Sequence, residues 1–188
     1  MIYAAKLDIG FEISPHNIER AKSLISNPGK LEIHQLSQMD LDPRLLVFLG
    51  KHRLSINHLE IFYTPPHTIG PIHVDGEPSS MQHTKMNFVH GANGSYMRWF
   101  ETISPGMQPR TVTTEIGTTS RIFHPEDARE VFRAEIGSPS IINAGVPHNV
   151  ENPTDEQRWC LSLVLRNTDG RLKWDAARDI FSAYMVDR

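Results

Sequence analysis

The sequence predicts a mainly β protein with flanking helices, in which the strands form a sandwich or barrel such as the jelly roll. From about Ser55 onward, short runs rich in β-branched and aromatic residues alternate with clusters of Gly, Pro and Asn. Many short strands with regular turn signals are typical of these architectures. Helical segments precede and follow this region, and a chain of 188 residues without an internal repeat is expected to form a single domain, 1–188.

Residues 1–54 are expected to supply strands and helices that pack on the β region. The apolar stretch 2–13 predicts one or two strands, and 31–34 predicts another. Ser14-Pro15 and Asp42-Pro43 each place an N-cap residue before a proline, which is the pattern that begins a helix. Apolar residues at helical spacing follow each start, namely Ile18, Ala21, Leu24 and Ile25 in the first helix and Leu45, Leu46, Phe48 and Leu49 in the second. Asn27-Pro28-Gly29 ends the first helix, and both helices are expected to cover one face of a sheet.

Residues 55–166 are expected to form the β core. The predicted strands are 56–63, 85–90, 96–102, 120–123, 131–136, 140–143, 146–150 and 159–165. His124-Pro125-Glu126-Asp127 predicts one helical turn among them. In the last segment, 171–188, residues 174–185 predict a closing helix whose apolar side consists of Ala177, Ile180, Phe181 and Tyr184.

The composition narrows the class of protein and its partners. Hydrophobic residues at 39% and charged residues at 22% suit a soluble globular protein rather than a disordered one. A net charge of −3 without a Lys/Arg cluster argues against nucleic acid as a partner. A single cysteine, Cys160, excludes an intramolecular disulfide. No signal-peptide core and no apolar run near the roughly 20 residues of a membrane helix are present, so we expect a cytoplasmic protein without a membrane partner.

One short stretch, His73-Val74-Asp75, carries the first chemical signal. Residues two apart on a strand point to the same face, so His73 and Asp75 can converge on one point. His148 can supply a third ligand to a divalent metal. Two histidines and one carboxylate that leave open positions are the ligand set of non-heme Fe(II) oxygenases. The alternative is coincidence, because the chain has 10 histidines.

The surroundings of these residues carry a family resemblance. Tyr63 lies ten residues before His73, and Arg158 lies ten residues after His148, in the stretch Pro147-His148-Asn149-Val150-Glu151-Asn152-Pro153-Thr154-Asp155-Glu156-Gln157-Arg158. The pattern resembles the Fe(II)/2-oxoglutarate-dependent dioxygenases, especially their aspartyl/asparaginyl β-hydroxylase-like and small phage or bacterial branches. It covers roughly residues 60–166 and does not clearly extend to the two N-terminal helices. The resemblance implies a double-stranded β-helix core, jelly-roll and cupin-like, over 55–166.

The resemblance also implies a role for each site residue. His73, Asp75 and His148 would bind Fe(II). Arg158 begins a strand on which Arg158, Cys160 and Ser162 share one face while Trp159, Leu161 and Leu163 share the other. An inward arginine needs an anion, and the distal carboxylate of 2-oxoglutarate would be that anion. By resemblance, Ser162 and Tyr63 would donate hydroxyl hydrogen bonds to the same co-substrate, and Asn87 would point into the barrel beside it.

Two of these roles have plainer alternatives, and two further residues could line the site. Arg158 can instead form a surface ion pair with Glu151 or Asp155, and a strand tyrosine such as Tyr63 can belong to the core. Arg98 and Trp99 can line the substrate side, but tryptophan there suits the core equally well.

The resemblance implies hydroxylation of an unactivated C–H bond with O2, releasing succinate and CO2. The carboxylate of Asp75 favours this outcome over halogenation, because halogenating members have a small residue there. By family analogy the substrate is a peptidyl or free amino-acid side chain or another small metabolite. Loops 64–71, 77–82 and 104–119 are expected to frame the opening. Two other functions remain open, a cupin-like metalloenzyme that does not use 2-oxoglutarate (an isomerase or other dioxygenase) and a non-catalytic ligand-binding β-sandwich.

Overall fold

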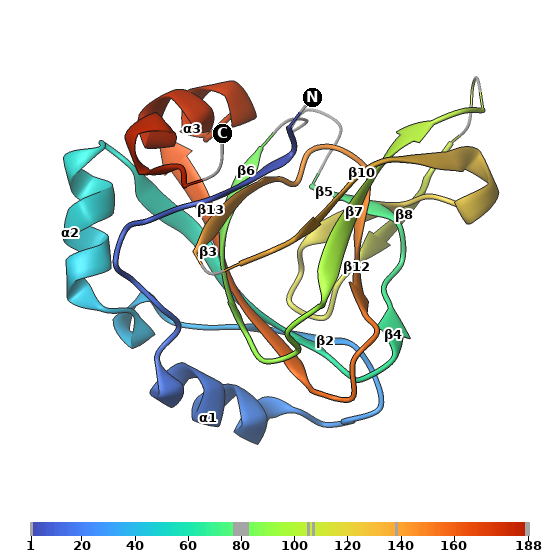
Figure 1. Cartoon of the computed structure of the whole chain (residues 1–188), viewed down its shortest axis with the longest axis horizontal. Helices are drawn as coiled ribbons and strands as arrows, with labels where there is room; N and C mark the ends of the chain where they lie inside the picture. Colours follow the sequence, from blue (N-terminus) through green and yellow to red (C-terminus); the bar gives the residue numbers. More distant parts are fainter. Residues whose placement is uncertain (1, 77–82, 105, 107, 138, 187–188) are drawn as a thin grey trace.

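Two seven-stranded sheets lie face to face in the computed structural model, which describes residues 2–76, 83–104, 106, 108–137 and 139–186 (Figure 1). The first sheet has the order β1 (Ala4–Lys6), β11 (Ser140–Asn143), β6 (Thr84–His90), β13 (Arg158–Asn167), β3 (Ser55–Thr64) and β2 (Glu32–Gln35), with β14 (Gly170–Arg171) beside β13. The second has the order β10 (Ala128–Glu135), β7 (Tyr96–Thr102), β12 (His148–Asn152), β5 (His73–Asp75), β9 (Thr119–Ile122) and β8 (Arg110–Thr113), with β4 (Thr68–Ile69) beside β12. This architecture confirms the predicted mainly β fold with a jelly-roll core and flanking helices.

Within the described residues three α-helices flank the sheets, α1 (Pro15–Leu24), α2 (Pro43–Lys51) and α3 (Trp174–Phe181). The first two begin where the sequence predicts. The Ser14 hydroxyl accepts a hydrogen bond from the backbone N–H of Asn17, and the Asp42 carboxylate accepts one from the N–H of Arg44. Both caps satisfy a backbone donor that would otherwise lack a partner at the helix start. Short 3-10 turns complete the helical segments, η1 (Gln38–Asp40), η3 (Pro125–Asp127) and η4 (Ser182–Tyr184), and η3 confirms the turn predicted at 124–127.

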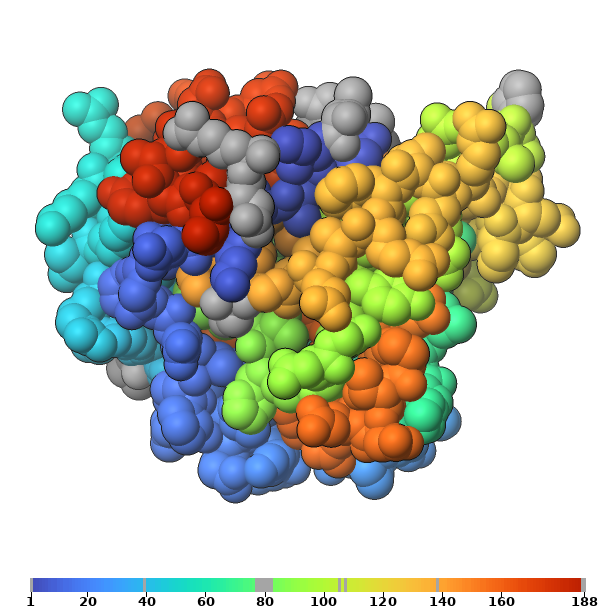
Figure 2. Space-filling view, viewed as in Figure 1, coloured from blue at the N-terminus to red at the C-terminus, as the bar shows by residue number. Residues whose placement is uncertain are grey.

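The helices cover the outer face of the first sheet, where they enclose the main hydrophobic core. Alternate residues of the three central strands point into this core, namely Leu59, Ile61 and Tyr63 of β3, Met86 and Phe88 of β6, and Trp159, Leu161 and Leu163 of β13. The helices contribute Ile18 and Ala21, Leu45 and Leu49, and Trp174, Ala177 and Phe181. In Figure 2 the N-terminal segments (blue) and the C-terminal helix (red) lie on one side of the molecule, and β10 (amber) lies on the other.

The structure differs from the sequence prediction mainly in short segments. In the stretch 2–13 only Ala4–Lys6 forms a strand, and the apolar residues Ile9, Phe11 and Ile13 instead pack against the helix-covered core. The predicted loop 104–119 contains β8, which forms a hairpin with β9 around a turn closed by Thr114 and Thr118. With four residues, β8 is too short for its alternation to exceed chance, whereas β9 overlaps the predicted strand 120–123. Among the described residues, no helix is long and apolar enough to span a membrane.

Candidate metal centre

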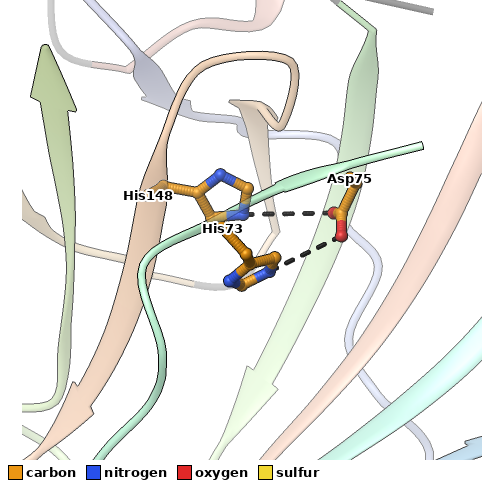
Figure 3. A group of neighbouring side chains, drawn as sticks. All are labelled: His73, Asp75 and His148. Atoms are coloured by element: carbon orange, nitrogen blue, oxygen red, sulfur yellow. Dashed lines mark ion pairs between the residues drawn. The ribbon is translucent and has the colours of Figure 1, made fainter. Parts of the chain in front are cut away.

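His73, Asp75 and His148 meet at the inner surface of the second sheet. His73 and Asp75 are the first and last residues of β5, and His148 begins β12 directly opposite His73 in the strand register. One ligand atom from each of the three lies within 4.8 Å of the others. His73 Nε2 is 3.5 Å from Asp75 Oδ1, and His148 Nε2 is 4.0 Å from Asp75 Oδ2 (Figure 3). The structure therefore brings together the three residues that the sequence singled out as metal ligands.

The backbone determines which nitrogen of each imidazole faces the cluster. His73 Nδ1 is 2.9 Å from the carbonyl oxygen of Pro71, and His148 Nδ1 is 2.8 Å from that of Val146. A carbonyl only accepts hydrogen bonds, so each Nδ1 carries the proton and donates it. Each Nε2 then presents its lone pair toward Asp75. Backbone support of this kind is the usual means by which proteins orient metal-binding histidines.

The charge states of the cluster suit a divalent cation. Burial alone would raise the pKa of Asp75, but the neighbouring charges, that of Lys85 above all, outweigh burial and hold this pKa well below its usual range. Burial, reinforced by the charge of His73, lowers the pKa of His148 to about 3. Asp75 is therefore ionised and His148 neutral at pH 7, which are the forms that bind metals. Together with His73, these groups form a set of nitrogen and oxygen atoms that could hold a metal ion.

A cavity of about 310 Å³ opens beside the three residues, between the two sheets. Its wall on the first sheet is built by the residues that alternate with the core residues. On the three central strands they are His58, Glu60, Phe62 and Thr64 of β3, Lys85 and Asn87 of β6, and Arg158, Cys160, Ser162 and Val164 of β13. The predicted alternation along 158–163 is thus confirmed.

Arg158 lines this cavity and is 1% exposed. Its Nε donates a hydrogen bond to the hydroxyl of Ser95 at 3.2 Å. Of the two acids considered as surface partners, Glu151 pairs with Arg98 at 3.1 Å and Asp155 with His67 at 2.8 Å. Among the described residues no carboxylate lies within ion-pair distance of Arg158. The alternative of a surface ion pair is therefore wrong.

Ser162 and Asn87 also line the cavity and contact each other. They are directly opposite in the register of β13 and β6, and the Ser162 hydroxyl donates to Asn87 Oδ1 at 2.7 Å. Asn87 points into the barrel, as expected from the sequence. Both side chains lie on the same wall as Arg158.

Tyr63 corrects the sequence prediction. It is directly opposite Trp159 in the register of β3 and β13, so it shares the outer face of the sheet with that tryptophan. Its ring packs on Trp159 at 4.8 Å between centroids, and its hydroxyl donates to the backbone oxygen of Pro28 at 2.8 Å. The expected hydrogen bond from this hydroxyl to a co-substrate in the cavity is therefore incompatible with the structure. The adjacent Thr64 lines the cavity instead.

Arg98 and Trp99 do not line the cavity either. Trp99 is 0% exposed and donates from Nε1 to the backbone oxygen of Asn143, which supports the core alternative. Arg98 forms ion pairs with Glu130 and Glu151. Their neighbour on β7, Met97, is the residue that reaches the cavity.

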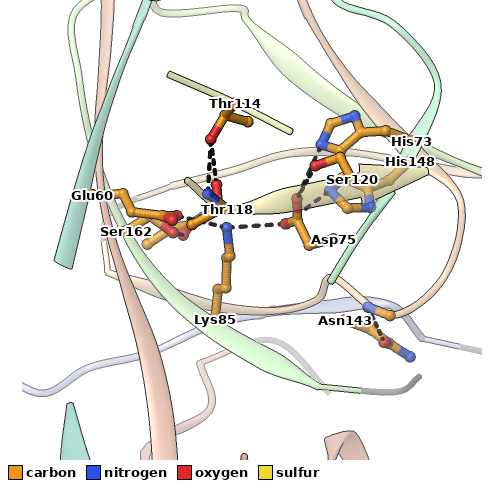
Figure 4. A network of polar contacts seen from close by, with 12 residues as sticks. Glu60, His73, Asp75, Lys85, Thr114, Thr118, Ser120, Asn143, His148 and Ser162 are labelled. Atoms are coloured by element: carbon orange, nitrogen blue, oxygen red, sulfur yellow. Dashed lines mark hydrogen bonds and ion pairs between the residues drawn. The ribbon is translucent and has the colours of Figure 1, made fainter. Parts of the chain in front are cut away.

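Two buried charged residues in the wall, Lys85 and Glu60, were not predicted from the sequence. Lys85 Nζ lies 3.0 Å from Asp75 Oδ2 and 2.9 Å from Glu60 Oε2, and both Lys85 and Glu60 are buried (Figure 4). The sequence does indicate the orientation of Lys85. It lies two residues before Asn87 on a predicted strand, so an inward Asn87 implies an inward Lys85.

The loops expected to frame the opening contribute in part. Gly70 and Pro71 line the cavity, as do Thr114 and the segment 116–119. The stretch 77–82 lies outside the described residues.

No family model and no curated protein matches the chain. Among solved structures, the chain overlaps Escherichia coli ycfD over 89% of its length at 14% identity and a TM-score of 0.42. It overlaps a Pseudomonas putida prolyl-4-hydroxylase over 81% of this chain and 83% of that one, at 12% identity and a TM-score of 0.40. HygX from Streptomyces hygroscopicus, with nickel and 2-oxoglutarate bound, overlaps over 81% and 76%, at 10% identity and a TM-score of 0.40.

The chain spans less than two thirds of some matched structures, including 42% of ycfD and 26% of procruciferin, an 11S globulin from Brassica napus. Overlaps at these identities and TM-scores assign no activity to the chain. The site has to be interpreted from its own residues.

Proposed function

We propose that this chain is an Fe(II)- and 2-oxoglutarate-dependent oxygenase that hydroxylates an unactivated C–H bond of an amino-acid side chain or small metabolite, releasing succinate and CO2. The observation that carries the proposal is one cavity with two complementary features. Two imidazole nitrogens and an ionised carboxylate converge on its second-sheet wall, and a buried arginine without a carboxylate partner among the described residues lies on the opposite wall.

The three acceptors fit a divalent metal. Neutral imidazoles and a carboxylate suit Fe(II), and three protein ligands leave positions for a chelating co-substrate and O2. When bound, the metal would supply the chemistry of O2 activation and electron transfer. The protein's own contribution would be to fix both imidazoles through Pro71 and Val146 and to supply an ionised Asp75. This carboxylate occupies the position that halogenating enzymes leave open, which supports hydroxylation.

The buried cation supports 2-oxoglutarate as the co-substrate. Burying an ion without a counter-charge costs several kcal/mol, so an anionic ligand for Arg158 is expected. A dicarboxylate can chelate the metal with one end and meet the guanidinium with the other. Ser162 and Asn87 lie on the same wall and would complete the polar lining along this ligand.

A metalloenzyme that does not use 2-oxoglutarate would need the three metal ligands but not an anion at Arg158. The two functions therefore differ in one measurable property, which is the affinity for 2-oxoglutarate in the presence of metal.

The decisive experiment is an anaerobic titration of the protein with Fe(II) and then with 2-oxoglutarate. We expect the visible absorption band that forms when 2-oxoglutarate chelates a protein-bound iron, followed by succinate formation on admitting air. Absence of both signals would overturn the proposal. Metal binding without any response to 2-oxoglutarate would favour the alternative metalloenzyme.

A further inference from the structure

A row of three charged groups crosses the cavity beside the candidate metal site. The ammonium of Lys85 lies 2.9 Å from Glu60 Oε2 on one side and 3.0 Å from Asp75 Oδ2 on the other. The exposed fractions of the side chains are 7% for Lys85, 4% for Glu60 and 17% for Asp75. Solvent therefore screens these charges weakly, and their mutual effects are strong.

The strand register builds this row. On β13, Ser162 is opposite Glu60 of β3, and Val164 is opposite Lys85 of β6. The offset of two residues lets Glu60 and Lys85 meet diagonally across β13, on the cavity side of the sheet. Figure 4 shows the lysine reaching from there toward Asp75, between the carboxylates of Glu60 and Asp75.

This arrangement has a consequence for metal binding. An ammonium that touches only a metal-binding carboxylate competes with the metal, because it neutralises the ligand and repels a second cation. A second carboxylate on the same ammonium cancels its charge and removes most of that competition. Glu60 is not among the groups whose ligand atoms cluster with the two histidines, so it would act through Lys85 and not on the metal directly.

We infer that Glu60 is the counter-ion of Lys85 and keeps the Asp75 carboxylate available to a divalent metal. Glu60 and Lys85 are then positioning residues of the metal site. The inference rests on the proposed function, because it presupposes that His73, Asp75 and His148 bind the metal.

The test is a titration of the 188-residue chain with Co(II) in the absence of 2-oxoglutarate, monitored by the visible absorption of the bound metal. Glu60→Gln is expected to weaken Co(II) binding by about tenfold, at the lower end of what changes around metal ligands cause. The double variant Glu60→Gln/Lys85→Met should recover an affinity within about threefold of the wild type, because the uncompensated ammonium is gone. Glu19→Gln is the matched control, since it makes the same charge change at an exposed ion pair with Lys22 on α1 and should leave Co(II) affinity unchanged.

The double variant separates an electrostatic role from a merely structural one. If Glu60 only supported the fold, removing Lys85 as well would not restore metal affinity, and that result would overturn the inference. An unchanged affinity in Glu60→Gln would overturn it too. Should Glu60→Gln fail to fold in a thermal melt of the apo protein, Glu60→Asp keeps the charge and withdraws it by one methylene. Co(II) binding by Glu60→Asp is then expected to be about threefold weaker than in the wild type, and an equal Co(II) affinity would contradict the counter-ion role.

Failure of the proposed function would look different. If the wild type does not bind Co(II), or if His148→Ala binds it equally well, the metal site itself is wrong, and this inference falls with it. If the wild type binds Co(II) through His148 but Glu60→Gln binds it equally well, only the counter-ion role is lost.

Discussion

The two faces of the first sheet differ in chemistry although the same strands build both. On β13, Trp159, Leu161 and Leu163 point outward into the helix-covered core. Arg158 and Ser162 alternate with them and point inward into the cavity. Burying an apolar side chain such as Leu163 stabilises the fold by roughly 1.5–3 kcal/mol. Burying a charge costs several kcal/mol unless a partner compensates it.

The difference indicates which face of the sheet stabilises the fold and which face is available to a ligand. The outer face supplies the apolar burial that supports the fold. The inner face carries Arg158, Lys85 and Glu60 in buried positions, and these buried charges are not needed to stabilise the fold. Substitutions on the two faces are therefore expected to have different effects. Those on the outer face should lower the free energy of unfolding, and those on the inner face should lower the affinity for ligands. Four experiments test this separation, from the largest expected effect to the smallest.

Replacing His148 should have the largest effect. His148→Ala removes one of three ligands and is expected to abolish metal binding, with a loss of affinity of at least about 100-fold, while the apo protein stays folded. Fe(II) or Co(II) titration measures the affinity, and circular dichroism checks the fold. His124→Ala is the control, because His124 is 68% exposed and belongs to no cluster with the metal ligands. Metal affinity close to that of the wild type in His148→Ala would contradict the site.

An outer-face change should give the opposite pattern. Leu163 is 0% exposed, so Leu163→Ala is expected to lower the free energy of unfolding by about 2–5 kcal/mol through lost burial and the cavity left behind. Urea unfolding measures this loss. Metal affinity, determined under conditions where the variant remains folded, should stay within about twofold of the wild type. A selective loss of metal affinity would show that the two faces are coupled.

Replacing Arg158 on the inner face should lower only the affinity for the co-substrate, 2-oxoglutarate. Arg158→Met keeps much of the side-chain volume and removes the charge. We expect 2-oxoglutarate affinity to fall by about 30-fold, or about 2 kcal/mol, with metal affinity preserved. The free energy of unfolding should not fall, because an uncompensated buried charge has been removed. Arg166→Met is the control on the same strand, since Arg166 is exposed. Equal losses of metal and 2-oxoglutarate affinity would contradict the assigned role.

The smallest effect is expected at the edge strand β2, where the side chain of Glu32 is 11% exposed. The backbone N–H of Ser26, followed by further hydrogen bonds from Ser26, Asn27 and His34, lowers the pKa of Glu32 to about 2 from its usual 4.5. A carboxylate with a depressed pKa in the folded state stabilises the fold above its unfolded pKa, and this contribution disappears as pH falls from about 4.5 toward about 2.

Urea unfolding between pH 5 and pH 2 measures that loss. Glu32→Gln should unfold with a shallower pH dependence in this window than the wild type. Metal affinity at pH 7 should not change, because Glu32 contacts none of the three ligands. Identical pH profiles for the two proteins would show that these hydrogen bonds add no net stability.

Much of the fold and of the candidate metal site could be predicted from local patterns. Ser14-Pro15 and Asp42-Pro43 begin helices because a capping side chain and a fixed proline φ act within a few residues. The alternation along β13 follows from the two-residue period of any strand. His73 and Asp75 share a face for the same reason, and their residue types, together with that of His148, predict a metal ligand set.

The tertiary structure alone decided which faces of neighbouring strands coincide. Tyr63 is opposite Trp159, so it belongs to the core, whereas Glu60 is opposite Ser162 and lines the cavity. The contact of Lys85 with Asp75 joins strands of different sheets, and no local pattern in either strand predicts it. The physical reason is that strand period is a local property, while sheet register and sheet packing depend on the burial and pairing of the whole chain. The sequence by itself therefore predicts a metal-binding role for His73, Asp75 and His148, and the tertiary structure determines which charged residues surround them.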